Sequence, residues 1–351
     1  MNLDDYTAFA KIDPDDMLAQ IDHLPEQLEE AWKLGLSLDL PKMSKIDSVV
    51  VAGMGGSAIG ADLVAATFAD ICPVPVFVQR DYGLPAWAKG RGVLAVLSSH
   101  SGNTEETLSA FDQAVQSNCQ IVTISTGGKL LEKAKQAGLP AWTFKHAGQP
   151  RAAVGFSYGL LLALFNRLGL ISDVNDAVAQ TVAALKEQRQ SLRAESPLSQ
   201  NPAKRTAGQL VGRYPTFFAA GHMAPVARRW KCQINEVAKA VAAFEALPES
   251  DHNTLAGISF PEEMLQKAIS FFIRSTSDLP RNQLRFELTQ QIMMNEGIST
   301  DSFMATGQTH LEQLWRAVQF GDYVSYYLAM AYETDPTAIP TISGLKSAMS
   351  K

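Results

Sequence analysis

The sequence predicts an α/β fold with two tandem doubly wound domains, in which parallel sheets are flanked by helices. Through the first half, apolar strand-like runs alternate with helical stretches on short connections. After Pro197 and Pro202 the same pattern restarts with a strand that ends in glycine, at 216–221. The length of 351 residues suffices for two domains with substantial cores. We expect a helical segment over 1–40, a first domain with connector helices over 41–195 and a second domain with C-terminal helices over 196–351.

The first half begins with apolar residues at helical spacing, so we expect one or two helices before residue 40, packed on the first domain. Five strands are then predicted, at 48–52, 74–78, 93–97, 120–124 and 141–144. Helices follow three of these strands, each after a turn rich in Gly, Ser or Thr. A long apolar helix to residue 168 and a mostly helical connector to about residue 199 complete this half.

The second half is predicted to repeat this order loosely, as a structural repeat and not a sequence repeat. The expected elements are a strand at 216–221, a helix at 223–239, a strand at 268–273, a helix at 281–295, a weak strand at 300–304 and a long helix at 309–332. Two doubly wound domains in tandem account for both halves.

Charge and composition exclude several classes of protein. A net charge of -6 and a pI near 5.6 argue against a nucleic-acid surface, which needs a concentrated basic face. No apolar run is long enough to cross a bilayer, and no apolar signal core follows the acidic N-terminus. Cys72, Cys119 and Cys232 lie far apart and resemble reduced core thiols. We expect a cytoplasmic protein with neither nucleic-acid nor membrane partners.

A serine- and threonine-rich turn follows the predicted strand at 93–97. Ser99, Ser101 and Thr104 fall where free backbone N–H groups and the helix dipole favour an anion. Gly102 permits a tight backbone path, and Asn103 or Thr104 is expected to cap the helix. Hydroxyls donate hydrogen bonds without a fixed positive charge, which suits a phosphate ester that must bind and leave. The alternative is a helix N-terminus with spare hydroxyls.

A glycine-rich turn, Gly53–Ala58, fits the dinucleotide pattern G-x-G-x-x-A between a strand and a helix. Alone it would indicate a nicotinamide-dependent dehydrogenase. However, the acidic residue expected at the end of the next strand, about 20 residues on, is not cleanly present. We favour a turn in which Gly55 and Gly56 let a sugar or phosphate approach the backbone, with Ser57 as a donor.

Five motifs in register carry a family resemblance. Besides the two turns, these are Gln149-Pro150-Arg151, the segment Lys231–Lys239 and the segment Leu247–Asn253. In that order and spacing they resemble the bifunctional phosphoglucose/phosphomannose isomerases of archaea and bacteria, which have the flavodoxin-like sugar isomerase (SIS) fold. The resemblance spans roughly residues 45 to 346.

The resemblance implies isomerisation of glucose 6-phosphate with fructose 6-phosphate, extended in a bifunctional enzyme to mannose 6-phosphate. One carboxylate must move a proton between C1 and C2 through a cis-enediol, and Glu236 matches the family's base. Arg151 would stabilise the negative charge on the enediolate oxygens. His252 would exchange protons during ring opening, reaching in from the second subunit of a homodimer with shared active sites. Lys346 matches a lysine near the ring oxygen.

The resemblance also assigns the phosphate to Ser57, Ser99, Ser101 and Thr104, and it implies no cofactor. No metal is required, and the sequence has no His/Asp/Glu cluster of metal spacing. Without the family, each catalytic candidate has a plainer interpretation. Glu236 would be a surface carboxylate paired with Lys239, Arg151 an ion-pair partner, His252 polar surface and Lys346 a solvated tail.

Two rival functions and two departures from the family pattern remain. A non-catalytic sugar-phosphate sensor is the first rival, although such regulators normally carry an attached partner domain, and a dehydrogenase is the second. His100 stands where the family usually has tyrosine; protonated, it would strengthen binding of a dianion, or it packs into the core. Ser250-Asp251 replaces the more common leucine and asparagine. The preference between glucose and mannose stays open.

Overall fold

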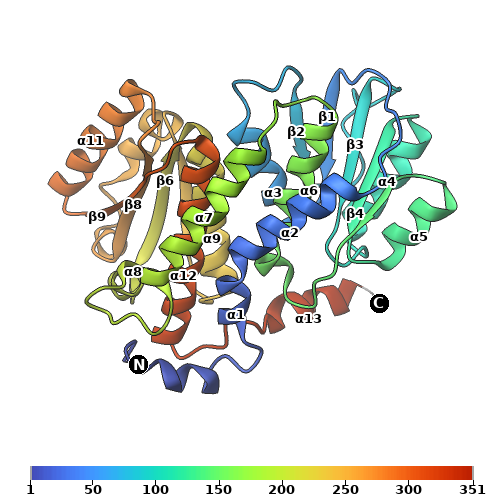
Figure 1. The fold of residues 1–351 in the computed structure, drawn as a ribbon. Helices are drawn as coiled ribbons and strands as arrows, with labels where there is room; N and C mark the ends of the chain where they lie inside the picture. Colours follow the sequence, from blue (N-terminus) through green and yellow to red (C-terminus); the bar gives the residue numbers. More distant parts are fainter. Residues whose placement is uncertain (1, 350–351) are drawn as a thin grey trace. The chain divides into compact units, whose positions relative to one another are not determined.

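The computed structural model describes residues 2–349 and confirms the predicted α/β fold with parallel sheets (Figure 1). Contacts divide the chain into two compact units, each built around one sheet. The first-sheet unit comprises His23–Ala184 and Thr309–Glu312. The second-sheet unit comprises Met1–Asp22, Leu185–Gln308 and Gln313–Lys351. The contacts therefore divide the chain after Ala184, within the predicted connector.

The N-terminal helices differ from the expectation that they pack together on the first domain. Only α2 (Leu24–Ser37) does so, against α6 (Val154–Arg167). The earlier η1 (Tyr6–Lys11) and α1 (Met17–Asp22) group with the second sheet. The physical reason is apolar burial, because Phe9 is 3% exposed and packs edge-on against Tyr326, with ring centroids 6.0 Å apart.

The first sheet has five parallel strands in the order β2-β1-β3-β4-β5. They are β1 (Ser48–Ala52), β2 (Val76–Gln79), β3 (Val93–Ser98), β4 (Gln120–Ser125) and β5 (Ala141–Thr143). The central strands β3 and β4 are buried along their whole length, as expected for continuous apolar runs covered on both faces. The edge strand β2 begins at Val76, later than predicted, because Pro75 precedes it and its side chains are only partly buried.

Helices cover both faces of the first sheet. Alternate residues of each strand point to opposite faces of the sheet. The face that carries Val50, Ala95 and Ile121 packs on α4 (Glu105–Gln116) and α5 (Gly128–Gln136). The helix α3 (Gly55–Thr67) contacts β1 and α6, and α6 packs on α2. Helices thus cover both faces of the sheet, so a ligand can reach it only where the strands end. We call these two sides the amino edge and the carboxyl edge of the sheet.

The second sheet has four parallel strands in the order β7-β6-β8-β9. They are β6 (Tyr214–Ala220), β7 (Ala243–Leu247), β8 (Ala268–Ser275) and β9 (Ser299–Ala305). One face packs on α11 (Pro280–Asn295) and the other on α9 (Ala224–Glu236) and α12 (His310–Ala331). Strand β7 was not predicted, because it is a short edge strand that is mostly half-buried and lacks an apolar run.

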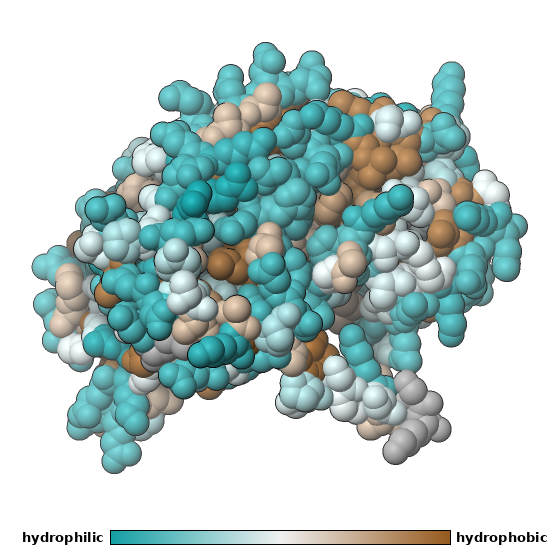
Figure 2. Space-filling model, turned by 60° about the horizontal axis from the view of Figure 1, so that its bottom comes forward, coloured by the Kyte–Doolittle hydropathy of each residue, from teal (hydrophilic) through white to brown (hydrophobic). Residues whose placement is uncertain are grey.

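Shorter elements complete the chain. They are η2 (Pro150–Ala152), α7 (Asn175–Leu192), α8 (Pro202–Leu210), η3 (Gly221–Met223), η4 (Glu249–His252), η5 (Thr254–Gly257), α10 (Glu262–Leu265) and α13 (Pro340–Met349). Every residue of α13 is exposed, and the helix forms the lobe that projects at the lower right of Figure 2. No helix within residues 2–349 has the length and hydrophobicity to span a membrane.

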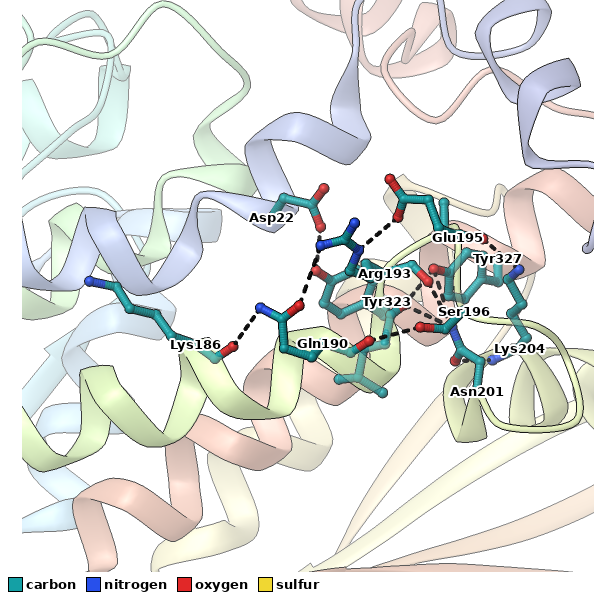
Figure 3. A network of polar contacts seen from close by, with 12 residues as sticks. Asp22, Lys186, Gln190, Arg193, Glu195, Ser196, Asn201, Lys204, Tyr323 and Tyr327 are labelled. Atoms are coloured by element: carbon teal, nitrogen blue, oxygen red, sulfur yellow. Dashed lines mark hydrogen bonds and ion pairs between the residues drawn. The ribbon is translucent and has the colours of Figure 1, made fainter.

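A polar network holds the turn between α7 and α8 against α12 (Figure 3). Asn201 caps α8 by accepting from the backbone N–H groups of Ala203 and Lys204. The Lys204 ammonium is fully buried and donates to the Ala194 carbonyl at 2.7 Å. Burial lowers the pKa of Lys204, and the nearby carboxylate of Asp4 opposes that shift. The helical connector is therefore anchored by hydrogen bonds as well as by apolar contacts.

Candidate functional site

The first sheet opens at the carboxyl ends of β1 and β3. These strands are neighbours, but β1 leads to β2 on one side while β3 leads to β4 on the other, which makes a topological switch point. The glycine-rich turn follows β1 and the serine-rich turn follows β3, so both lie at this edge. A Cβ added to Gly53 would lie 2.7 Å from the backbone oxygen of Ser98, so the glycine-rich turn begins against the last residue of β3, directly before the serine-rich turn.

The glycine-rich turn brings Arg151 to the same edge. Gly55 has φ +50 and opens α3. The Ser57 and Ala58 N–H groups donate to the Met54 carbonyl, at 3.1 and 3.4 Å, which leaves the N–H groups of the two glycines as candidates for a ligand. A Cβ on Gly56 would lie 2.5 Å from the Pro150 oxygen, so only glycine permits this approach. Arg151 follows in η2 with 3% exposure, and its Nη1 donates to Gln149 Oε1 at 3.3 Å. The backbone of the buried residue Arg151 therefore lies next to the N-terminus of α3.

The serine-rich turn is held by its own hydroxyls. Ser99, 2% exposed, accepts from the Gly102 N–H at 3.1 Å, and its Oγ is 2.8 Å from Thr104 Oγ1. Ser101 is exposed and accepts from the Asn103 N–H at 3.2 Å. Thr104 is the N-cap residue of α4, one of the two positions expected, but its side chain makes no capping hydrogen bond. Its hydroxyl bonds to Ser99 instead.

A third turn, which the sequence reasoning did not assign to the site, supports the second. Thr126, after β4, donates from both N and Oγ1 to the His100 carbonyl, at 2.9 and 2.7 Å. A Cβ on Gly102 would lie 1.8 Å from the oxygen of Gly127. Asn103 accepts from the Lys129 N–H at 3.1 Å, in the first turn of α5. The available signal was the Thr-Gly-Gly sequence directly after a strand.

His100 packs inward within its domain. Its Nε2 is 3.0 Å from Nδ1 of His146, and its ring centroid is 5.8 Å from that of Phe144. Burial, and to a lesser degree the charge of His146, lower the pKa of His100 to about 4. Burial also lowers the pKa of His146. His100 is therefore uncharged near neutral pH, which favours its packing role over binding of a dianion.

The proposed base, Glu236, is the last residue of α9. That helix is fixed by a buried cluster, in which Asp322 of α12 accepts from Arg229 Nη2 at 2.6 Å and from Gln233 Nε2 at 3.0 Å. Burial raises the pKa of Asp322, while the Arg229 guanidinium opposes this. Glu236 lies seven residues after Arg229 and three after Gln233, hence on the same helix face. The cluster therefore sets the direction of the face that carries Glu236.

Other residues of the Lys231–Lys239 motif hold the end of α9. Asn235 Nδ2 donates to the Ala240 carbonyl at 2.7 Å. Lys239, at φ +55, donates from Nζ to the backbone carbonyls of Glu236 and Val237, at 2.7 and 3.3 Å. Much of the motif therefore shapes the backbone around Glu236, which is itself partly buried.

His252 lies at the opposite edge of the second sheet from Glu236. Helix α9 starts just after the carboxyl end of β6 and runs back, so Glu236 precedes the amino end of β7. His252 follows the carboxyl end of β7, in the turn η4, and is exposed. Five strand residues separate the two edges, which corresponds to about 16 Å. Within one chain these two side chains cannot meet at the same reacting atoms, because proton transfer needs hydrogen-bond reach.

Lys346 lies on the exposed helix α13, which follows α12. Just beyond the end of α12, the Tyr332 hydroxyl accepts from the Gly212 N–H at 2.8 Å, next to the amino end of β6. The segment that leads to Lys346 therefore leaves the amino edge, as the Glu236 turn does. Among residues 2–349 there is no group of three or more His, Cys, Asp or Glu side chains arranged to hold a metal ion.

Comparisons with known proteins place this arrangement in context. The family model "Bacterial phospho-glucose isomerase C-terminal SIS domain" matches residues 199–349. A bifunctional phosphoglucose/phosphomannose isomerase of Caldicellulosiruptor bescii is 37% identical, over 95% of this chain and 99% of its own length. Another from Aquifex aeolicus is 33% identical, over 86% and 90%. A hypothetical protein from Thermus thermophilus has a crystal structure similar in fold alone, with a TM-score of 0.72 at 16% identity over 95% and 89% of the two chains.

Proposed function

Because the chain belongs to the bifunctional phosphoglucose/phosphomannose isomerase family, we propose that it interconverts fructose 6-phosphate with glucose 6-phosphate and mannose 6-phosphate. The observation that carries this proposal is the meeting of the glycine-rich turn, the serine-rich turn and Arg151 at the β1/β3 edge. That edge combines backbone donors, hydroxyls and one buried cation. These are the groups that a sugar phosphate requires.

The phosphate is bound at the N-termini of α3 and α4 in this proposal. Both helices begin at the carboxyl edge of the first sheet, so their dipoles and free N–H groups favour the same anion. Ser57, Ser99, Ser101 and Thr104 supply hydroxyls, of which Ser101 is exposed while Ser57 and Ser99 are buried. With His100 uncharged, the turn holds no fixed positive charge of its own that would retain the product.

The isomerisation itself needs one carboxylate. Glu236 removes the C2 proton of the open-chain aldose; the electron pair of that C–H bond forms the C1=C2 bond of a cis-enediolate, and the carbonyl pair moves to O1. The O2 hydroxyl proton then passes to O1, so that O2 becomes the carbonyl oxygen of the product. Return of the proton to C1 gives the ketose, so the carboxylate is regenerated. Arg151 stabilises the negative charge that develops on the O1 and O2 oxygens. Mannose 6-phosphate and glucose 6-phosphate give the same enediol, because they differ only at C2.

Ring opening is assigned to His252, with Lys346 near the ring oxygen. In the aldose ring the C1–O5 bond breaks as O5 takes up a proton and the O1 hydroxyl loses one. In the fructose 6-phosphate ring the C2–O5 bond breaks in the same way, and the O2 hydroxyl loses the proton. Since Glu236 and His252 lie at opposite edges of the second sheet, we assign His252 to the active site of a second copy of the chain. The site would then be shared across a homodimer.

An exposed apolar row on α11 supports pairing with a second copy. Leu284, Leu288 and Ile292 recur every four residues and are 41%, 50% and 42% exposed. The opposite side of α11 carries Phe286 and Met293 in the core. A row of this kind beside the turn that carries His252 is suited to burial against an identical chain.

We also propose a cytoplasmic location. Cys72, Cys119 and Cys232 are free thiols, and burial raises the pKa of Cys119 and Cys232. Cys119 is buried and the other two are partly buried. Unpaired thiols suit a reducing compartment.

The proposed reaction is tested by incubating the purified protein with fructose 6-phosphate and quantifying glucose 6-phosphate and mannose 6-phosphate separately by chromatography. Formation of both products is expected. Glucose 6-phosphate alone would restrict the activity to one epimer. Absence of both products, with fructose 6-phosphate still bound in calorimetry, would overturn the isomerase assignment and favour a sensor.

The shared site is tested by mixing two inactive variants. We expect Glu236→Gln and His252→Ala each to lose about 10²- to 10⁴-fold in kcat, the usual contribution of a positioned proton-transfer group. After subunit exchange, mixed dimers hold one site with both groups intact, so activity should recover to about a quarter of the normal value. A mixture of Glu236→Gln with Glu236→Ala is the matched control and should stay inactive. No recovery in the first mixture would place both residues in one chain's site.

A further inference from the structure

His252 lies in a short, exposed turn, yet the residue before it is firmly anchored. Asp251 immediately precedes His252, and its side chain is 10% exposed. Its Oδ2 accepts from Arg285 Nη1 at 2.8 Å, and its Oδ1 accepts from Thr289 Oγ1 at 2.9 Å. Both donors belong to α11, one helical turn apart. The turn η4 is therefore attached to a regular helix through both oxygens of one carboxylate.

The residue after His252 is anchored as well. Asn253 Nδ2 donates to Glu249 Oε1 at 3.1 Å, and Asn253 Oδ1 accepts from the Thr254 N–H at 2.6 Å. The backbone of the turn adds bonds from the Asp251 N–H to Pro248 and from the Asn253 N–H to Ser250. His252 is thus an exposed side chain on a backbone that is held on both sides.

Helix α11 is a firm support for this anchor. Thr289 is 2% exposed, and Phe286 and Met293 of the same helix are buried in the core against the second sheet. A carboxylate that accepts from a guanidinium and a hydroxyl makes charge-assisted bonds, which are shorter and stronger than neutral ones. Such bonds fix geometry more strictly than packing of an exposed turn could.

We propose that Asp251 is a positioning residue for His252: by binding Arg285 and Thr289 of α11, it holds the η4 turn so that His252 extends to the sugar ring in the active site of a second copy. This inference rests on the proposed function. Asp251 itself neither contacts the substrate nor exchanges a proton in this scheme. Its loss therefore affects catalysis only through His252, and only in the step that opens the ring.

The test is a double-mutant cycle with fructose 6-phosphate as substrate. Asp251→Ala should lower kcat about tenfold, since it misplaces a group whose proton transfer is worth about 10²- to 10⁴-fold, with KM changed less than about twofold. In a His252→Ala background, Asp251→Ala should add no further loss, because its only route to catalysis is gone. Thr289→Val, which removes one of the two bonds and keeps the shape, should show a smaller loss of the same kind.

A second readout separates ring opening from general damage. The analogue 5-deoxyfructose 6-phosphate lacks the 5-hydroxyl and stays open-chain, so it needs no ring opening. With this substrate, Asp251→Ala and Thr289→Val should be as active as the unmodified protein. Glu287→Gln is the matched control, because it disrupts another ion pair on α11, to Arg274 at 3.5 Å, away from the η4 turn; its activity should be unchanged with both substrates.

The outcomes distinguish this inference from the proposed function. Normal activity of His252→Ala would refute the assigned role of His252, and with it the basis of the inference. Impaired His252→Ala together with normal Asp251→Ala would overturn the inference and leave the proposed function intact. The same holds if the Asp251→Ala loss persists in the His252→Ala background or with the open-chain substrate. If Asp251→Ala fails to fold, Thr289→Val takes its place in the cycle, with the same criteria.

Discussion

The two sheets have the same strand order, but the hydroxyl groups in their corresponding turns have different hydrogen-bond partners. In the first sheet, the turn after β3 keeps Ser101 exposed at the switch point. In the second, Ser275 at the end of β8 donates to Gln313 Oε1 at 2.6 Å, and its N–H donates to Asp278 at 2.7 Å. Gln313 also donates to Ser277 Oγ at 2.8 Å. The hydroxyls of the second turn are thus bound to the protein itself.

This difference shows that hydroxyls at a switch point do not by themselves make an anion site. The second turn holds a buried carboxylate, Asp278, which is 7% exposed and would repel a phosphate. The first turn has no such group among Ser99–Thr104. The second-sheet unit instead presents its proposed catalytic carboxylate, Glu236, at the amino edge. The second unit therefore repeats the fold of the first but not its proposed anion site.

The largest effect on stability is expected from the contrast between α3, which follows β1, and α9, which follows β6. In the second sheet, α9 depends on the buried Arg229–Asp322 pair, whereas α3 in the first packs through glycines. Asp322→Ala removes the carboxylate that faces the buried Arg229 guanidinium, so it should lower the free energy of unfolding by about 3–5 kcal/mol. Denaturant unfolding measures this. A loss below about 1 kcal/mol would show that the pair does not anchor α9.

The glycines that end β1 and β6 should differ in what they affect. Gly53→Ala would place a Cβ 2.7 Å from the Ser98 oxygen and force the two turns apart, at a cost of about 1–3 kcal/mol and with a raised KM for fructose 6-phosphate. Gly221→Ala has open space around it, so only its φ of +54 opposes the change, at about 1–2 kcal/mol, with KM unchanged. Equal KM values for the two variants would contradict the prediction that only Gly53→Ala disturbs the phosphate site.

The two serine turns should respond oppositely to loss of a hydroxyl. Ser101→Ala removes an exposed donor, so we expect KM for fructose 6-phosphate to rise about tenfold, the effect of losing one hydrogen bond to a charged group. The bond from the Asn103 N–H that is also lost is exposed, so the free energy of unfolding should fall by no more than about 0.5 kcal/mol. Ser275→Ala leaves Gln313 Oε1 without this donor, so unfolding free energy should fall by about 1–3 kcal/mol with KM unchanged. Thermal unfolding and steady-state kinetics on both variants test this, and the reverse pattern would refute it.

The smallest effect is on the pH dependence of stability, and it comes from the His100–His146 contact. The corresponding turn of the second sheet, Ser275–Asp278, contains no histidine. The folded-state pKa of His100, about 4, lies below its ordinary value of 6.5. Between these values the unfolded chain binds more protons, so unfolding free energy should fall as pH is lowered from 6.5 to 4, by at most about 1.4 kcal/mol per pH unit for this residue. In His100→Tyr the melting temperature should fall less over this range. Parallel curves for the two proteins would exclude a contribution from His100.

The sequence by itself determined the fold class and most of the elements. The buried strands are continuous apolar runs, whose pattern depends on local spacing, and the site turns follow them directly. It also placed Gly55, Ser99 and Arg151 in turns that the fold brings to one edge. Their catalytic and binding roles stay predictions. Several elements escaped the pattern, among them the short helices α8 and α10, the edge strand β7 and the exposed helix α13. Neither β7 nor α13 has a fully buried face that imposes a period.

Only the tertiary structure decided how distant residues act on one another. It grouped η1 and α1 with the second sheet, paired His100 with His146 and attached Asp251 to α11. It also separated Glu236 from His252 by the length of β7, although the two are close in sequence. Each of these outcomes depends on burial and on charges contributed by remote segments. Local spacing carries no information about such contacts, because they are set by which faces pack together once the sheets have formed.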